Sequence, residues 1–223
     1  PGLFQGDVAD TADAGFSTDV KTPELAGLRP VGQIWGEFLV AESPDGYFFI
    51  IDQHGAEERC AYEQLKKLYM GGGDFKRQML LLPERFEATP EECEALSHAS
   101  GELLRLGFEV IPFGPSPGGA GESFLIKSVP DILAGKRADG LIKDLSAEIV
   151  RVGGSSRAEC RIEDALMRIA CHSVIRGLRT LAPQEAQALL TKLARVDFSG
   201  YCPHGRPVVK KFTRKDIEAM FKR

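Results

Sequence analysis

The stretch WGEFLVAESPDGYFFIID, residues 35–52, predicts the central hairpin of the fold. Its two ends, residues 35–41 and 47–52, are apolar-rich runs of strand length. Ser43-Pro44-Asp45-Gly46 between them is a turn sequence, because Pro presets φ and Gly accepts a positive φ. The hairpin is therefore expected to place Asp52 at the C-terminal end of a strand.

The sequence after this hairpin predicts a mixture of helices and strands. A helix over residues 54–70 is expected to end at Gly71-Gly72-Gly73. Capping or proline signals predict further helices from Thr89, Ser156, Pro183 and Thr213, and an amphipathic pattern predicts one over 141–150. Residues 78–86, 108–113 and 123–129 are typical of extended strands. The sequence therefore predicts an α/β (α+β) fold.

The order of these segments also suggests a domain organisation. Residues 75–155 are predicted to be an insertion into a domain made from both chain ends, residues 28–74 and 156–223. Residues 1–27 have little periodic apolar content and are interpreted as the remnant of a flexible linker, with ordered structure beginning near Leu28. No initiator Met is present, so the chain is expected to be a piece of a longer protein.

Composition excludes several classes of protein. The 223 residues are 43% hydrophobic, which argues against a wholly disordered chain. No apolar run approaches the roughly 20 residues of a membrane-spanning helix. The formal charge of −4 excludes a uniformly basic nucleic-acid coat but not a local basic patch. Five Cys without a C-x-x-C pair favour a reducing, cytoplasmic setting, with thiols that fill the core or bind metal.

Asp52, His54 and Glu58 form the first candidate site. Asp52 ends a predicted strand, while His54 and Glu58 are four residues apart and share one face of the next helix. Carboxylate and imidazole donors in this arrangement suit a divalent metal ion. The alternative is a capped helix with a solvent-facing His–Glu pair, which the spacing alone favours.

Two cysteine motifs could contribute further ligands. Cys202 and His204 are two apart in a Pro/Gly-stiffened segment and point to the same side, as a zinc-type donor pair would. The alternative is a buried thiol beside a turn histidine. Cys171 lies beside the apolar stripe of a helix, where a core thiol is the simpler interpretation. The carboxylates could also hold Mn²⁺ or Mg²⁺.

Two further motifs each allow two interpretations from the sequence pattern. A basic C-terminal stretch could bind phosphate or form a solvated helix face, and charge alone favours the second. It comprises Arg206, Lys210, Lys211, Arg214, Lys215, Lys222 and Arg223. The segment Gln78-Met79-Leu80-Leu81-Leu82-Pro83 fits either a peptide that docks in a groove or an edge strand ended by Pro, and its pattern favours the strand.

Jointly, these motifs resemble the C-terminal domain of the MutL family of DNA mismatch-repair proteins, in its bacterial endonuclease-bearing form. The family signature D-Q-H-A-x-x-E-x-x-x-x-E is similar to residues 52–63, with Gly55 in place of the usual Ala. The other elements are A-C-[HKR]-x-x-[IV]-[KR] at residues 170–176, C-P-H-G-R-P at 202–207 and F-x-R at 221–223. Gln78 to Pro83 looks like the sliding-clamp-binding motif.

The resemblance implies a metal-dependent endonuclease that nicks one strand of duplex DNA in mismatch repair. It implies a homodimer built by residues 28–74 and 156–223, with 75–155 as an external regulatory subdomain. The implied partners are duplex DNA, the replication sliding clamp and the mismatch-recognition protein MutS, in a bacterial cytoplasm close to the nucleoid. ATP would act only through an N-terminal domain outside this chain.

The resemblance also assigns roles to residues. The expected metal ligands are Asp52, His54, Glu58, Cys171, Cys202 and His204; the first three are expected to be catalytic with Mn²⁺ or Mg²⁺, and the last three to favour a structural or regulatory Zn²⁺. Glu63, rotated by about 140° from Glu58 on an ideal helix, and Arg176 are expected to support the ligands rather than bind the metal. Expected DNA contacts are Arg206, Lys210, Lys211, Arg214 and Arg223.

Two other functions remain as alternatives. One is a non-catalytic, zinc-stabilised dimerisation module of a mismatch-repair protein, against which the full motif set argues. The other is a metal-dependent hydrolase acting on a small substrate or peptide. The H-E-x-x-H zinc signature of such enzymes is absent, because Gly55 follows His54.

Overall fold

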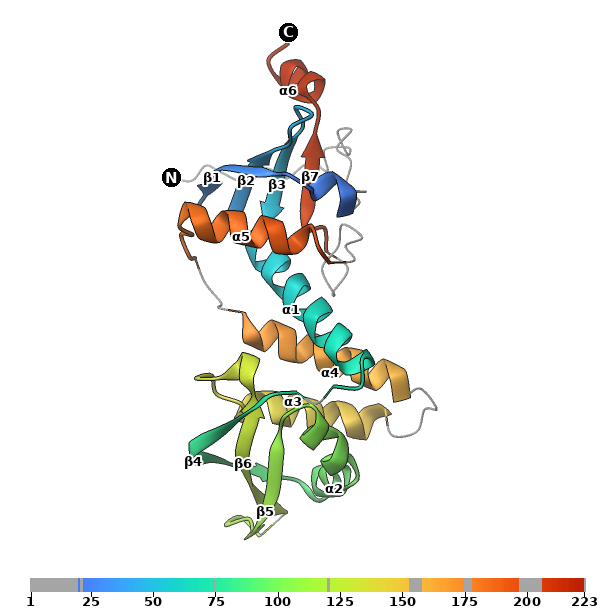
Figure 1. The fold of residues 1–223 in the computed structure, drawn as a ribbon. Helices are drawn as coiled ribbons and strands as arrows, with labels where there is room; N and C mark the ends of the chain where they lie inside the picture. The colour runs from blue at the N-terminus through green and yellow to red at the C-terminus, as the bar shows by residue number, and fades with distance from the viewer. Residues whose placement is uncertain are drawn as a thin grey trace, which may run out of the picture. The chain divides into compact units, whose positions relative to one another are not determined.

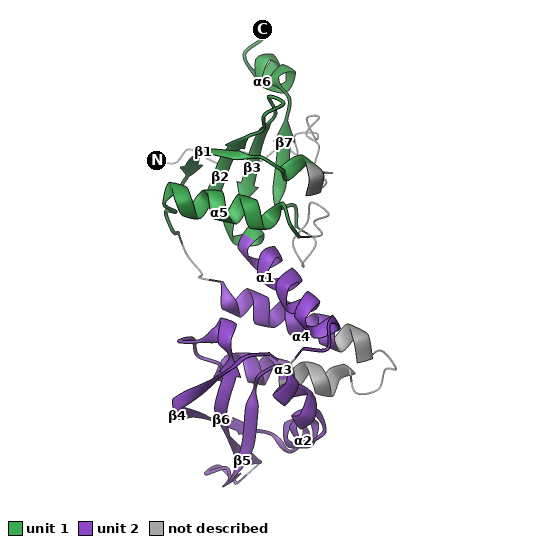
Figure 2. Ribbon diagram, in the orientation of Figure 1, with its two compact units in different colours: residues 1–56, 178–223 green, residues 57–177 purple. Residues whose placement is uncertain are grey.

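The computed structural model describes residue 20 and residues 22–73, 75–119, 121–152, 158–174, 178–196 and 206–222. The chain divides into two compact units, residues 1–56 with 178–223 (unit 1) and residues 57–177 (unit 2), as Figure 2 shows. Helices and antiparallel sheets occur in both, so the predicted mixed α and β fold class is confirmed (Figure 1). Among the described residues, no helix is both long and apolar enough to cross a membrane.

Unit 1 is built on a four-stranded antiparallel sheet in the order β1-β2-β3-β7. The strands are β1 (Arg29–Ile34), β2 (Phe38–Glu42), β3 (Phe48–Asp52) and β7 (Val209–Phe212). In the register, Ile51 lies opposite Leu39 on one side and Val209 on the other, and all three are buried. Figure 1 shows α5 (Pro183–Leu193) lying across this sheet, and four of its side chains, Ala186, Leu189, Leu190 and Leu193, are buried.

The hairpin predicted over residues 35–52 is confirmed, with two corrections at its start. Residues 35–37 form a turn rather than strand, and β1 precedes it as an additional edge strand. Both central residues of the turn, Trp35 and Gly36, have positive φ (54° and 70°), as a type I′ hairpin turn requires. The Gly at position 36 takes this conformation without strain, whereas Trp35 does not.

Ordered structure begins before the predicted start at Leu28. A short 3-10 helix spans Thr22–Leu25, and the Leu25 side chain is buried. Glu24 of this helix forms an ion pair with Lys211 of β7. Burial of Leu25 and this ion pair hold residues 22–25 of the predicted linker, whereas residues 1–19 and 21 lie outside the described residues.

Helix α1 (Gln53–Met70) follows β3 directly, close to the predicted bounds, and the division between the units falls inside it, after Ala56. The chain leaves α1 through residues 71–73, where Gly72 has a φ of 71°. The run of glycines therefore ends the helix as predicted. The functional subdomains predicted at 28–74, 75–155 and 156–223 stay a prediction, because contacts within the chain do not assign a function to either unit.

Unit 2 contains a three-stranded antiparallel sheet in the order β4-β6-β5. Its elements are β4 (Arg77–Ala88), α2 (Pro90–Arg105), β5 (Glu109–Pro115), β6 (Glu122–Pro130), α3 (Asp139–Val152) and α4 (Ala158–Ser173). The capping box predicted at Thr89 is present, since its hydroxyl accepts the Glu92 N–H and the Glu92 carboxylate accepts the Thr89 N–H. Phe108, Ile126 and Ile169 lie at the centre of a core shared by the sheet and these helices.

Candidate functional site

The candidate site begins where β3 passes into α1. The Asp52 N–H donates to the Val208 carbonyl (2.8 Å), and the Gln53 N–H donates to the Glu37 carbonyl (2.9 Å). The last residue of the strand and the first residue of the helix are therefore held from opposite sides. This fixes the backbone at the point where the sequence places its Asp-Gln-His motif.

The Asp52 side chain caps the first turn of α1. Its Oδ1 accepts a hydrogen bond of 3.1 Å from the Gly55 N–H, so one otherwise unpaired amide of the helix N-terminus is satisfied. A carboxylate at this end is also favoured by the helix dipole. The half-buried carboxylate is thus oriented before any ligand arrives.

Gly55 allows this close packing. A Cβ at position 55 would lie 3.0 Å from Cγ2 of Val208 and 3.2 Å from Oδ2 of Asp52. Gly55, at which this chain departs from the family signature, is therefore buried between the Asp52 carboxylate and Val208, the residue before β7. Its missing side chain leaves space for both groups, and its backbone is more flexible than that of Ala.

The remaining signature residues of α1 differ in their surroundings. His54 is exposed, whereas Glu58, one turn later, is 7% exposed. The solvent-facing His–Glu pair considered from the spacing is therefore wrong for Glu58. Glu63 forms an ion pair of 2.6 Å with Arg59, and both side chains are largely buried.

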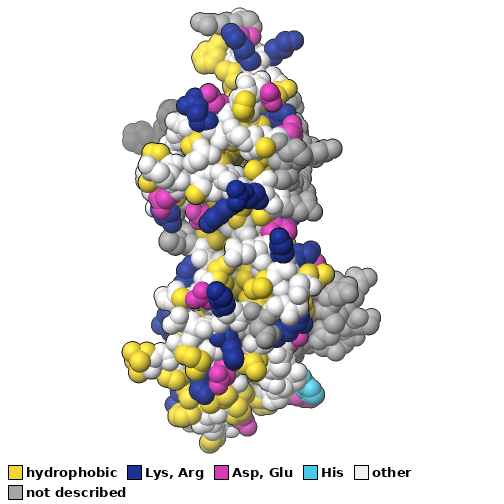
Figure 3. Space-filling view, viewed as in Figure 1, with side chains coloured by type: hydrophobic (Ala, Val, Ile, Leu, Met, Phe, Trp, Pro, Cys, Tyr) yellow, Lys and Arg dark blue, Asp and Glu magenta, His cyan; other side chains and the backbone are white. Residues whose placement is uncertain are grey.

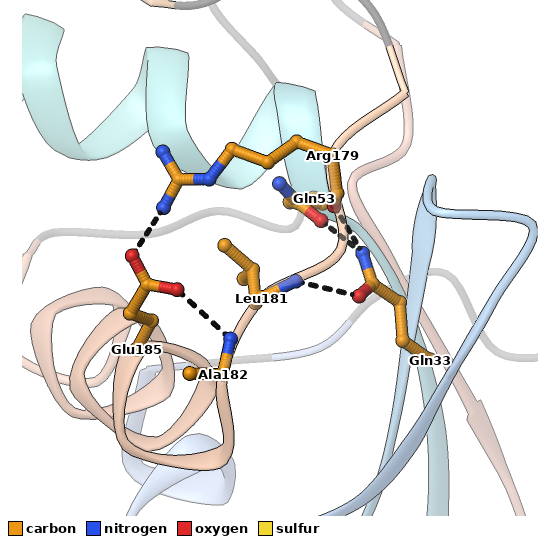
Figure 4. A network of polar contacts seen from close by, with 6 residues as sticks. All are labelled: Gln33, Gln53, Arg179, Leu181, Ala182 and Glu185. Atoms are coloured by element: carbon orange, nitrogen blue, oxygen red, sulfur yellow. Dashed lines mark hydrogen bonds and ion pairs between the residues drawn. The ribbon is translucent and has the colours of Figure 1, made fainter.

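Gln53 joins the motif to the rest of unit 1 (Figure 4). Its Oε1 accepts a hydrogen bond from Nε2 of Gln33 on β1. The same Gln33 amide group donates to the Arg179 carbonyl (2.8 Å) and accepts from the Leu181 N–H (2.9 Å). One glutamine thus bridges the start of α1 and the segment that leads into α5.

The other predicted ligands are only partly described. Cys171 lies near the end of α4 in unit 2, where its side chain is half-buried. Cys202, His204, Arg176 and Arg223 lie outside the described residues. Within the ranges that the structure describes, no three His, Cys, Asp or Glu side chains form a group that could hold a metal ion. The described residues thus place Asp52, Gln53 and His54 at one junction, and the full predicted ligand set stays a prediction, because two of its members lie outside the described residues.

The predicted DNA contacts of unit 1 also differ from one another. Arg206 and Lys210 are exposed. Lys211 is paired with Glu24 and lies 3.9 Å from the centre of the Tyr47 ring. Arg214 forms an exposed ion pair of 2.7 Å with Glu218 on α6 (Arg214–Met220). Lys211 therefore has a structural role that its position in a basic stretch did not reveal.

The segment Gln78–Pro83 lies in β4, an edge strand, and interrupts it. Pairing with β6 is regular up to Met79 and resumes at Glu84, so residues 80–83 bulge from the sheet. Leu81 is 97% exposed and Leu82 is 81% exposed. Figure 3 shows hydrophobic side chains gathered on the surface of this part of unit 2. The segment is in an edge strand, as the pattern favoured, but Pro83 does not end that strand.

Directly after this bulge in the sequence, Glu84 connects β4 to the start of α3. Oε2 of Glu84 accepts the N–H groups of Ala138 (3.0 Å) and Asp139 (3.2 Å) at the start of α3. This carboxylate caps a helix that lacks a conventional capping sequence. Sequence reasoning missed both Glu84 and Gln33, because the partners of each are distant along the chain.

Comparisons with known proteins agree with the motifs. Residues 31–181 match the family described as MutL C terminal dimerisation domain. The chain is 39% identical over 207 residues to a protein of Geobacter sp. (strain M21) and 37% identical over 199 residues to one of Pelobacter propionicus. Both are named DNA mismatch repair protein MutL. These alignments cover 93% and 89% of this chain but 31% of either relative, so the chain spans about a third of their length.

Proposed function

The chain belongs to the MutL family of DNA mismatch-repair proteins, and on that premise we propose that it is a homodimeric, metal-dependent endonuclease domain that nicks one strand of duplex DNA. The observation that carries the proposal is the junction of β3 and α1. There, a carboxylate fixed by a helix N-terminus stands two residues from an exposed imidazole. A non-catalytic dimerisation module could use Asp52 as a helix cap, but it does not need an exposed imidazole beside that carboxylate.

The donor chemistry of the junction suits a divalent ion. Asp52 and Glu58 offer carboxylate oxygens and His54 offers an imidazole nitrogen, with Cys171, Cys202 and His204 proposed as further, zinc-favouring ligands. A bound Mn²⁺ or Mg²⁺ would supply Lewis-acid activation of water and charge neutralisation at the phosphate. The chain itself holds the Asp52 carboxylate in place through Gly55 and the backbone of β3.

DNA would be held through its backbone. Arg206 and Lys210 are exposed cations on or next to β7 in unit 1. Contacts between Lys or Arg and phosphate position a duplex without reading its sequence, which suits a nuclease that must cut at many sites. MutS and an ATP-binding N-terminal domain, absent from this chain, are proposed to direct where and when it acts.

The bulge at residues 80–83 is proposed to bind the sliding clamp. Two adjacent leucines, nearly fully exposed and raised out of an edge strand, favour insertion into an apolar groove. Binding to the clamp would raise the local concentration of the nuclease on DNA, which a chain with a net charge of −4 needs more than a basic one.

A second copy of the chain is proposed to dock at the tip of the β1–β2 hairpin. Trp35 is 77% exposed, and Val31, on the edge strand β1 that precedes this turn, is 55% exposed. Leu178, 72% exposed, lies against Gly36 of the same turn. Exposed apolar groups of this size are typical of protein interfaces, where aromatic residues carry much of the binding energy.

The nuclease proposal is tested with supercoiled plasmid and Mn²⁺, comparing the wild-type chain with Asp52→Asn. Asn caps a helix about as well as Asp, so this variant keeps the fold but loses the charge that binds metal. We expect nicking in the wild type and none in the variant. Asp45→Asn, in the exposed β2–β3 turn, is the matched control and should nick normally. Equal activity of wild type and Asp52→Asn would remove Asp52 from the mechanism, and an inactive dimeric wild type would favour the dimerisation module.

A further inference from the structure

The hydrogen-bond network of Figure 4 includes Gln53, the residue between Asp52 and His54, yet none of its members is among the expected catalytic residues. We propose that Gln33 is a positioning residue that fixes the first turn of α1, and so the Asp52 carboxylate and the His54 side chain, through Gln53. This inference rests on the proposed function only for its catalytic consequence. The positioning itself can be measured without metal or DNA.

The first argument is the use of the Gln33 amide group. Both N–H bonds of its Nε2 are engaged, one with Oε1 of Gln53 and one with the Arg179 carbonyl, while its Oε1 accepts the Leu181 N–H. Only the carboxamides of Gln and Asn offer two donors and an acceptor in one plane, and the Asn side chain is one methylene shorter. Glu at this position would lose both donors, and Leu would lose all three hydrogen bonds.

The second argument is burial. Gln53 is 6% exposed and Leu181 is 8% exposed. Polar groups at such positions are costly to leave unpaired, so the network resists displacement more strongly than an exposed one would. Gln53 is also held through its backbone by Glu37. The side chain and main chain of a single residue thus set the direction in which α1 starts.

The third argument is continuity beyond Gln33. Arg179 forms an ion pair of 2.7 Å with Glu185, and the Ala182 N–H donates to the other oxygen of the same carboxylate (2.8 Å). Glu185 therefore fixes both the loop that meets Gln33 and the start of α5 (Figure 4). Gln33 consequently connects α1 to a segment that is itself anchored, rather than to a loose loop.

The test measures residue-resolved amide hydrogen exchange in the metal-free chain. In Gln33→Leu, the amides of Gln53 and Gly55 should exchange about 5- to 10-fold faster than in the wild type, the factor expected for loss of one hydrogen bond. The amide of Phe49, in the middle of β3, reports global unfolding and should change less. Gln187→Leu is the matched control, because Gln187 also donates its amide to a backbone carbonyl, that of Leu28 (3.0 Å), but away from α1.

A double variant separates positioning from general destabilisation. If Gln33 acts through Gln53, then Gln33→Leu/Gln53→Leu should accelerate exchange at Gly55 no more than the larger single effect. Exchange at Gln53 and Gly55 that is unchanged in Gln33→Leu, or that rises equally in Gln187→Leu, would overturn the proposal. Fully additive single effects would overturn the route through Gln53.

The catalytic consequence is measured in a separate experiment, the Mn²⁺ dependence of nicking. At limiting Mn²⁺, Gln33→Leu should need about 10-fold more Mn²⁺ for half-maximal nicking, as is typical when a group that orients a metal ligand is lost, whereas Gln187→Leu should match the wild type. A wild-type chain that does not nick would defeat the proposed nuclease and leave the exchange result to decide the role of Gln33. Faster exchange with unchanged Mn²⁺ dependence would show that Gln33 positions α1 without affecting the metal site.

Discussion

Oδ1 of Asp52 accepts a hydrogen bond from the backbone N–H of Gly55, three residues further along the chain. Gly55 is tightly packed, because a Cβ at this position would lie 3.0 Å from Cγ2 of Val208. The residue that ends the strand and the residue that lets the helix start close to it thus form one unit. Substitutions at Gly55 should therefore report on the packing of the site.

Gly55→Ala should stabilise the chain less than Gly101→Ala. A Cβ at Gly101, exposed in the middle of α2, meets nothing within 4 Å, so the Ala variant should gain about 1 kcal/mol from helix propensity. At Gly55 the same gain is opposed by contacts with Val208 and Asp52. Thermal unfolding of both variants measures the difference, and an equal gain at the two positions would contradict the packing argument.

Leu81→Ser/Leu82→Ser should weaken clamp binding strongly without changing stability. Both side chains are largely exposed, so their removal should alter the free energy of unfolding by less than about 0.5 kcal/mol. If they are the anchors of the docked segment, affinity for the clamp should fall by at least about 10-fold. Surface plasmon resonance with immobilised clamp measures this effect.

Leu104→Ser provides the control for the clamp experiment. Leu104 is a leucine of α2 in the same unit, 44% exposed, and outside the bulge. Its variant should bind the clamp as the wild type does. Retained binding by the double variant would move the clamp site elsewhere.

Trp35→Gly should weaken the dimer and leave the monomer at least as stable. Gly accepts a φ of 54° without strain, and relief of that strain is worth about 1 kcal/mol. Loss of the exposed indole should raise the dimer dissociation constant by about 10-fold or more. Sedimentation equilibrium measures the constant. An unchanged constant would contradict the first part of the prediction, and a lower melting temperature of the monomer would contradict the second.

Tyr69→Phe should change how stability depends on alkaline pH. Burial, and then the hydrogen bond from the Tyr69 hydroxyl to Glu102 (2.6 Å), raises the pKa of Tyr69 above its ordinary value of 10.0. Its contribution is therefore fully present below pH 10.0 and is lost as the pH rises through the higher pKa of the folded state. At pH 7 the variant should be less stable by about 1 kcal/mol.

The difference in the free energy of unfolding between wild type and Tyr69→Phe should then become smaller above pH 10. Urea unfolding at a series of pH values measures it, with Tyr62 and Lys66, whose pKa values are also raised, unchanged in both proteins. A difference that stays constant up to pH 11.5 would show that Tyr69 does not ionise differently in the folded and unfolded chains.

Local signals in the sequence predicted most of the elements. Thr89 and Thr213 both cap helices in the structure because a hydroxyl and a carboxylate three residues later interact within one turn. The β1 strand was missed because Pro30 and Gly32 break its apolar alternation, and Val31 and Ile34 are exposed. The β7 strand was also missed, because Lys210 and Lys211 at its centre interrupt the apolar pattern, although Val209 and Phe212 on either side are buried.

The candidate site could be predicted only where its residues are close in sequence. Asp52 and His54 are two residues apart, so strand and helix periodicities sufficed to place them at one junction. Gln33 bonds to residues 53, 179 and 181, and no periodicity links those positions. The exposure of Leu81 and Leu82 was likewise hidden, because it depends on a register shift against β6.

The position of β7 has a consequence for synthesis on the ribosome. Val209 pairs with Ile51, and all of unit 2 lies between them in the sequence, so unit 2 has been translated completely before the fourth strand of the unit 1 sheet is made. Until then, the edge of β3 that β7 will cover is open to other nascent or unfolded chains, and closure over so long a loop is slow. Cotranslational protection of this edge, rather than the rate of helix formation, should therefore limit the yield of correctly folded protein.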